Sequence, residues 1–113
     1  MGNSSDRALE AMRIKEAKGE EISLNDIVRD ATAIVPKYHE EHSNDTIVIK
    51  VGDKQTDRIP LGPIPSRKYE FEVPKAWLLD HAGTAVKLKF SYTLYLGDLN
   101  RLDSDFIEYT ITH

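Results

Sequence analysis

The chain reads His-Glu-Glu-His from His39 to His42, and this is the first pattern in it that could do chemistry. Imidazole nitrogens and carboxylate oxygens are common ligands of divalent metals, and two histidines three positions apart can share one helix face. The metalloprotease helix requires His-Glu-x-x-His, however, so the second histidine comes one residue too early. A helix is also not expected between Pro36 and Asn44. We therefore interpret the segment as a solvated loop in which metal binding would be adventitious.

Aspartates in predicted loops form the second candidate site. Calcium needs several oxygen ligands that converge at one point. The stretch from Asp53 to Asp57 lacks the glycine and the bidentate glutamate of an EF-hand loop. We expect these residues to form turns, with calcium shared with a neighbouring domain as the alternative. The aspartates concerned are Asp53, Asp57, Asp98, Asp103 and Asp105.

Three aromatic residues, Trp77, Tyr69 and Tyr95, could stack against a sugar. Trp77 lies next to two leucines in a short predicted helix, so we expect it to plug one end of the core. Tyr95 lies on the polar face of its predicted strand, which makes it the best candidate for an exposed aromatic. A single exposed tyrosine is weak evidence for a carbohydrate-binding site.

No catalytic constellation is recognisable in the sequence. There is no cysteine, which excludes disulfides, thiolate metal sites and cysteine nucleophiles. No serine stands in a nucleophile motif, and no glycine-rich phosphate loop is present. We therefore assign no catalytic, cofactor-binding or metal-binding residue, and we expect neither a cofactor nor enzymatic activity.

Composition is that of one domain with a packed core. The chain has 113 residues, of which 40% are hydrophobic and 30% charged, and the net charge is −4. Nucleic acids and anionic membranes need clustered positive charge, so neither is expected as a partner. No apolar run approaches the roughly 18 residues of a membrane span.

The longest regular pattern runs from Val86 to Gly97, where apolar and polar residues alternate with a period of two. Such a run predicts a central strand with one face buried and the other in water. The same alternation predicts strands at residues 12–17, 30–36, 45–52, 68–74 and 106–112, with a weaker strand at 55–61. Residues 22–28 fit either a strand or one helical turn. Pro74 suits the first turn of a short helix over residues 75–80, which Gly83 can end.

These elements predict an all-β fold: an antiparallel β-sandwich of about seven strands with one short helical turn. Residues 1–11 are expected to be disordered, residues 12–113 to form the sandwich, and residues 97–103 to form a loop. The predicted core consists of Ile47, Ile49, Val51, Phe71, Val73, Val86, Leu88, Phe90, Tyr92, Ile107, Tyr109 and Ile111.

Several motifs follow one another in a familiar order. Residues 30–38 read D-A-x-x-x-V-P-x-Y, and residues 45–52 read D-T-I-x-I-x-V-G. The sequence E-V-P ends at Pro74, and G-x-x-V-x-L-x-F-S-Y-T-L follows from Gly83 to Leu94 before a terminal Y-x-I. This resembles the bacterial immunoglobulin-like repeat domains of large Gram-negative surface and adhesin-type proteins, over roughly residues 12–113. The loop at residues 97–103 is longer than is usual in that family.

The resemblance implies an immunoglobulin-like, non-catalytic module on the bacterial cell surface or outside the cell, often one of many in tandem. Its partners would be neighbouring domains of the same polypeptide, or a host or cell-surface protein or glycan. Two glycosylation sequons, at Asn3 and Asn44, carry little meaning in a bacterial protein. The alternative function is a carbohydrate-binding or adhesive tip domain. Such a domain should cluster two or more exposed aromatics in one patch.

Overall fold

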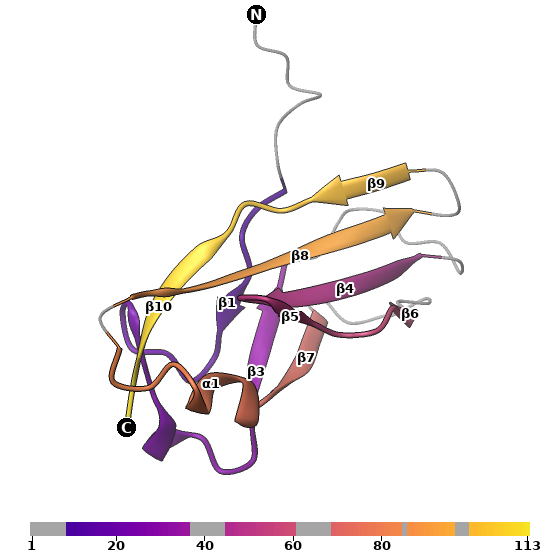
Figure 1. Ribbon diagram of the computed structural model, residues 1–113. Helices are drawn as coiled ribbons and strands as arrows, with labels where there is room; N and C mark the ends of the chain where they lie inside the picture. Colours follow the sequence, from indigo (N-terminus) through magenta and orange to yellow (C-terminus); the bar gives the residue numbers. More distant parts are fainter. Residues whose placement is uncertain (1–8, 37–44, 61–68, 85, 97–99) are drawn as a thin grey trace, which may run out of the picture.

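Alternating apolar and polar residues build two β-sheets that pack face to face (Figure 1). The computed structural model describes residues 9–36, 45–60, 69–84, 86–96 and 100–113. Within these ranges no helix is long and apolar enough to cross a membrane. The predicted all-β sandwich is confirmed.

The first sheet has the strand order β1-β3-β7, and both of its pairings are antiparallel. In β3 the side chains of Ala31, Ala33 and Val35 are fully buried, whereas the residues between them are half-buried. The short apolar residues of this strand therefore face the second sheet. The strands are β1 (Arg13–Ile14), β3 (Asp30–Val35) and β7 (Tyr69–Pro74).

The second sheet has the strand order β2-β10-β8-β4-β5, with β6 also paired to β4 and β9 also paired to β8. Its central strand is β8, the long alternating strand predicted from the sequence. One pairing differs from the antiparallel expectation, because β2 and β10 run parallel. The strands are β2 (Glu21–Ser23), β4 (Thr46–Val51), β5 (Lys54–Gln55), β6 (Ile59–Pro60), β8 (Leu88–Leu96), β9 (Asn100–Asp103) and β10 (Ile107–Thr112).

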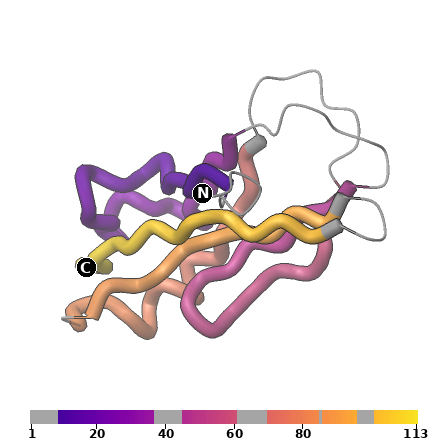
Figure 2. The backbone as a smooth tube through the Cα atoms, turned by 90° about the horizontal axis from the view of Figure 1, so that it is seen from above, coloured from indigo at the N-terminus to yellow at the C-terminus, as the bar shows by residue number. Residues whose placement is uncertain are grey.

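Two short helical turns lie at one end of the sandwich. The predicted helical turn is present as α1 (Ala76–Leu79), and residues 24–26 form the 3-10 turn η2 (Leu24–Asp26). The Lys75 ammonium group donates a hydrogen bond of 2.9 Å to the Ile27 carbonyl and so ties the two turns together. The last strand runs along the molecule to the C-terminus at this end (Figure 2).

The strand order can be compared with that of an immunoglobulin-like sandwich. Strands β1, β3 and β7 of the first sheet then take the places of strands A, B and E. Strands β4 and β8 take the places of C and F. Strands β9 and β10 together take the place of G, because both pair with β8 on the same side of it. The expectation of a loop through residues 97–103 was wrong for residues 100–103, which form β9.

The core lies between the two sheets and is centred on Phe90, which meets the Tyr109 ring edge-on at 5.4 Å between ring centroids. Most of the predicted core residues are buried. Phe71 and Ile107 are only partly buried, and Val86 is 74% exposed, so its assignment to the core was wrong. The ladder begins at Leu88, opposite Tyr109, and Val86 precedes it. The alternation in the sequence begins at Val86, two residues before the strand does.

Thr93 also departs from the pattern of its strand. Alternation places it on the polar face of β8, yet it is 1% exposed. Its hydroxyl donates a 2.7 Å hydrogen bond to the Asp103 carboxylate on β9. Pairing with β9 therefore covers a position that the sequence pattern assigns to water.

Candidate binding surface

The histidine motif lies outside the described residues, because residues 37–44 are not among them. The same holds for Asp98 and for the two sequon asparagines. The backbone of Tyr69 belongs to β7, but its side chain is also outside the description. None of these predicted positions is tested by the structure.

The remaining loop aspartates are spread over separate parts of the second sheet. Asp53 and Asp57 are exposed on either side of β5, whereas Asp103 and Asp105 lie at the end of β9 and beyond it. Among the described residues, no group of three or more His, Asp or Glu side chains is placed to hold a metal ion.

Asp103 has a structural partner. The Thr93 hydroxyl and, at 3.3 Å, the Arg101 guanidinium both donate hydrogen bonds to its carboxylate. These contacts, the Thr93 hydrogen bond above all, lower the pKa of Asp103 below its ordinary value. The carboxylate therefore anchors β9 to β8.

The described aromatics do not form one platform. Trp77 is half-buried and packs against the core, as expected for a plug at the end of the sandwich. Tyr95 is only half-buried, and the Arg58 guanidinium lies over its ring at 3.9 Å from the ring centre. Phe106 is 53% exposed, with the Lys89 ammonium group 4.4 Å from its ring centre, and sequence reasoning missed it.

The rings of Tyr95 and Phe106 lie near opposite ends of β8. Tyr95 lies near the end of the strand, whereas the partner of Phe106 is Lys89, near its beginning. Six residues of extended strand separate these positions, which corresponds to about 20 Å. A flat sugar-stacking patch would need them side by side.

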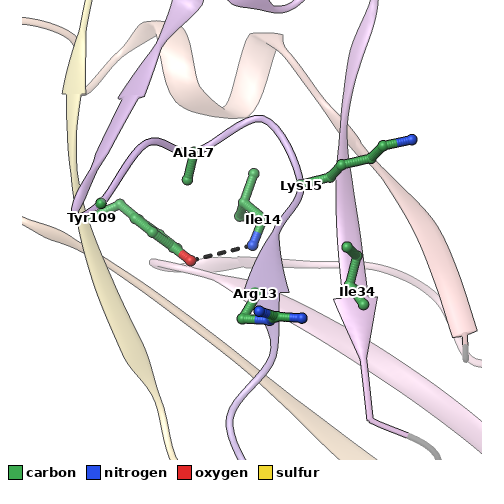
Figure 3. A pocket seen from close by; sticks show the side chains of 7 residues that line it. Arg13, Ile14, Lys15, Ala17, Ile34 and Tyr109 are labelled. Atoms are coloured by element: carbon green, nitrogen blue, oxygen red, sulfur yellow. Dashed lines mark hydrogen bonds between the residues drawn. The ribbon is translucent and has the colours of Figure 1, made fainter.

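A cavity of about 320 Å³ opens between β1 and β10 (Figure 3). It lies where the N-terminal part of the chain crosses from one sheet to the other. Figure 3 shows the hydroxyl of Tyr109 directed at Ile14, while the charged ends of Arg13 and Lys15 point away from that hydroxyl. The lining residues are Arg13, Ile14, Lys15, Ala17, Gly19, Ile34 and Tyr109.

The Tyr109 hydroxyl accepts a buried hydrogen bond of 3.2 Å from the backbone N–H of Ile14. The carbonyl of Ile14 accepts a second bond, of 3.1 Å, from the N–H of Ala17. Ile14 is the residue of β1 whose backbone groups face away from β3, since Lys15 donates to Thr32 on β3. The edge of β1 is therefore closed from within the protein, and another strand cannot pair with it there.

The sequence carries one signal for this contact. Tyr109 takes a core position that phenylalanine could fill, and a buried tyrosine hydroxyl usually has a hydrogen-bond partner. The identity of that partner, 95 residues away in the chain, has no local signature. The lining of the cavity thus includes the Tyr109–Ile14 hydrogen bond, which is structural, and the exposed side chains of Arg13 and Lys15. Its lining residues include no nucleophile–base pair.

No protein-family model, curated protein sequence or solved structure matches this chain.

Proposed function

We propose that the chain is a non-catalytic structural or interaction module. In this proposal it is one immunoglobulin-like repeat that spaces or presents other domains of a bacterial extracellular protein. The observation that carries the proposal is the strand order of the two sheets, which matches the order in immunoglobulin-like sandwiches. In domains of this type a rigid sandwich presents loops and sheet edges to other molecules. The bacterial and extracellular assignments rest on the sequence resemblance.

The surface chemistry supports a spacer more than a sugar-binding tip. The aromatics Tyr95 and Phe106 are separated along the sheet, and each is paired with a basic side chain. The cavity beside β1 has one hydrogen-bonded tyrosine among its lining residues and no aromatic platform. Because fold alone does not determine function, the proposal needs a direct test.

The test places the whole chain between two fluorescent proteins through its two ends. A spacer should fold in this context, keep its thermal midpoint and hold the two fluorophores at one fixed distance by energy transfer. A broad distribution of distances, or unfolding of the inserted domain, would argue against spacing.

A glycan array tests the alternative with the same protein. We expect no glycan to bind above the level of a domain denatured beforehand. Specific binding that is lost in Tyr95→Ala or Phe106→Ala, but kept in Lys54→Ala as an exposed control, would favour the carbohydrate-binding function instead.

A further inference from the structure

The outer face of the first sheet, which points away from the core, carries its charges in two rows. Arg13 in β1 and Lys15 just after it are exposed on this face. In β7, Glu70 and Glu72 are exposed on the same face, whereas Val73 between β7 and the core is buried. A basic row therefore follows one edge of the sheet, and an acidic row follows the opposite edge.

The strand register sets the two rows level with each other. Each line across the sheet has a cation on the β1 side, an uncharged residue on β3 and a carboxylate on β7. The two lines are Arg13, Ile34 and Glu70, and Lys15, Thr32 and Glu72. Neighbouring strands lie about 4.8 Å apart, so the rows are separated by about 10 Å. The face is thus positive along one edge and negative along the other.

The cavity beside β1 opens next to the basic row. Its lining includes Arg13, Lys15 and Ile34, and none of its lining residues is acidic. Arg13 and Ile34 lie next to each other on paired strands, as Figure 3 shows. In the part of the chain that the structure describes, neither cation has an ion-pair partner. The cavity therefore leaves room beside both cations for carboxylates that come from another molecule.

A second copy of this chain carries the complementary pattern. A half-turn about an axis along β3, in the plane between the two faces, lays the acidic row of one copy over the basic row of the other. The same operation lays the second basic row over the first acidic row, so both halves of the contact are equivalent. A half-turn about an axis across the strands would instead set cations against cations, and charge disfavours it.

We propose that the outer face of the β1-β3-β7 sheet binds the same face of a second copy, with the strands of the two copies running in the same direction. Arg13 then lies opposite Glu70 of the second copy, and Lys15 lies opposite its Glu72. The half-buried Ile34 side chains of the two copies meet between these ion pairs and add an apolar contact.

The size of the face limits the strength of this contact. Three strands of up to six residues cover roughly 14 Å by 20 Å, or on the order of 300 Å² on each copy. A stable complex usually buries about 800 Å² on each partner, so one pair of domains should associate weakly. If the chain is one repeat of a tandem array, several contacts of this kind would act together. That consequence rests on the proposed function, whereas the contact between two domains does not.

Self-association of the full chain tests the proposal, and its salt dependence shows which charges act. The net charge of −4 repels a second copy, so salt would strengthen a contact that ignored the two rows. We expect the opposite: the dissociation constant should rise at least about tenfold between about 0.01 M and about 1 M salt, as measured by sedimentation. Amide resonances of Thr32 and Ile34 should shift with protein concentration. A chain that stays monomeric at about 1 mM in low salt would refute the contact.

Two charge-reversed variants test the rows directly. Arg13→Glu with Lys15→Glu makes both rows acidic, and Glu70→Lys with Glu72→Lys makes both rows basic. Each variant alone should self-associate at least about tenfold more weakly than the natural chain at about 0.1 M salt. An equimolar mixture should associate to within roughly threefold of the natural chain, because every acidic row then meets a basic one. Recovery in the mixture also shows that both variants are folded.

The control reverses two cations on the other sheet. Lys50→Glu with Lys54→Glu changes the net charge as much as the first variant does, but on β4 and β5. This control should associate to within roughly threefold of the natural chain. Equal loss in the control, or no recovery in the mixture, would overturn the proposal. Recovery in the mixture together with a failed energy-transfer experiment would refute the spacer function alone.

Discussion

Replacing Tyr109 by phenylalanine removes one oxygen atom and isolates one hydrogen bond. The ring and its edge-on contact with Phe90 can remain, since the change adds no volume. The N–H of Ile14 loses its acceptor, and both residues are only 3% exposed. A buried donor left without a partner costs about 1–3 kcal/mol. For a domain of this size each kcal/mol lowers the thermal midpoint by about 4–8 °C.

We therefore expect Tyr109→Phe to lower the thermal midpoint by roughly 5–20 °C and the urea midpoint accordingly. The matched control is Tyr95→Phe, because the Tyr95 hydroxyl has no hydrogen-bond partner among the described residues and its ring lies under Arg58. The control should change stability by about 0.5 kcal/mol or less.

Amide hydrogen exchange locates the effect within the molecule. In Tyr109→Phe the N–H of Ile14 should exchange faster than in the natural sequence, because the edge of β1 opens there. Unchanged midpoints for Tyr109→Phe, or protection of Ile14 equal to that in the Tyr95→Phe control, would refute the claim that this hydroxyl closes the edge.

Three further outcomes are expected. Phe90→Ala should lower the free energy of unfolding by about 3–5 kcal/mol in a urea titration, because the ring is fully buried. Lys89→Ala, on the opposite face of β8, should lower it by at most about 0.5–1 kcal/mol, through the lost contact with Phe106. Equal urea midpoints for the two variants would show that the buried and exposed faces are reversed. Burial raises the pKa of Tyr92 to about 12 from its ordinary value of 10.0. The unfolded chain therefore releases this proton first as the pH rises from 10 to 12. The free energy of unfolding should therefore be highest below pH 10 and should fall between pH 10 and 12 by up to about 1.4 kcal/mol per pH unit. The fall should be smaller than this limit, because Glu10 is exposed and solvent screens its charge from the Tyr92 hydroxyl. Tyr92→Phe should flatten this fall, and an identical pH profile would contradict it. Thermal melts with EDTA, calcium or zinc should coincide, and a rise of several degrees with one metal would reveal a site that stabilises the native state.

The parts of the fold that the sequence could predict are those where one strand carries its own signal. In β8 the apolar residues Leu88, Phe90, Tyr92 and Leu94 are all at most 4% exposed, as a period of two requires. The helical turn α1 also had a local cause, because Pro74 stops the preceding strand and the residues after it favour a helix. Local rules such as these need no knowledge of the partner strand.

The parts that could not be predicted depend on segments distant in the chain. β9 has the sequence Asn-Arg-Leu-Asp, which carries no alternation, and it becomes a strand only because β8 offers an edge to pair with. Its presence in turn buries Thr93 and gives Asp103 a partner. For the candidate sites, the sequence indicated correctly that Trp77 packs against the core, but it overestimated the exposure of Tyr95, because nothing local places Arg58 over that ring.

The parallel pairing of β2 with β10 is the clearest case of a non-local cause. Three residues are too few to show a period, and residues 22–28 fitted a strand and a helical turn equally well. The structure resolves this by dividing the segment: Ile22 enters the core as part of β2, and Leu24 begins the 3-10 turn. The chain can reach β10 there only because it has already crossed from β1, whose edge Tyr109 closes. Tyr109 of the last strand thus holds the outer edge of β1, and the segment that follows β1 crosses over to lie parallel to that same last strand.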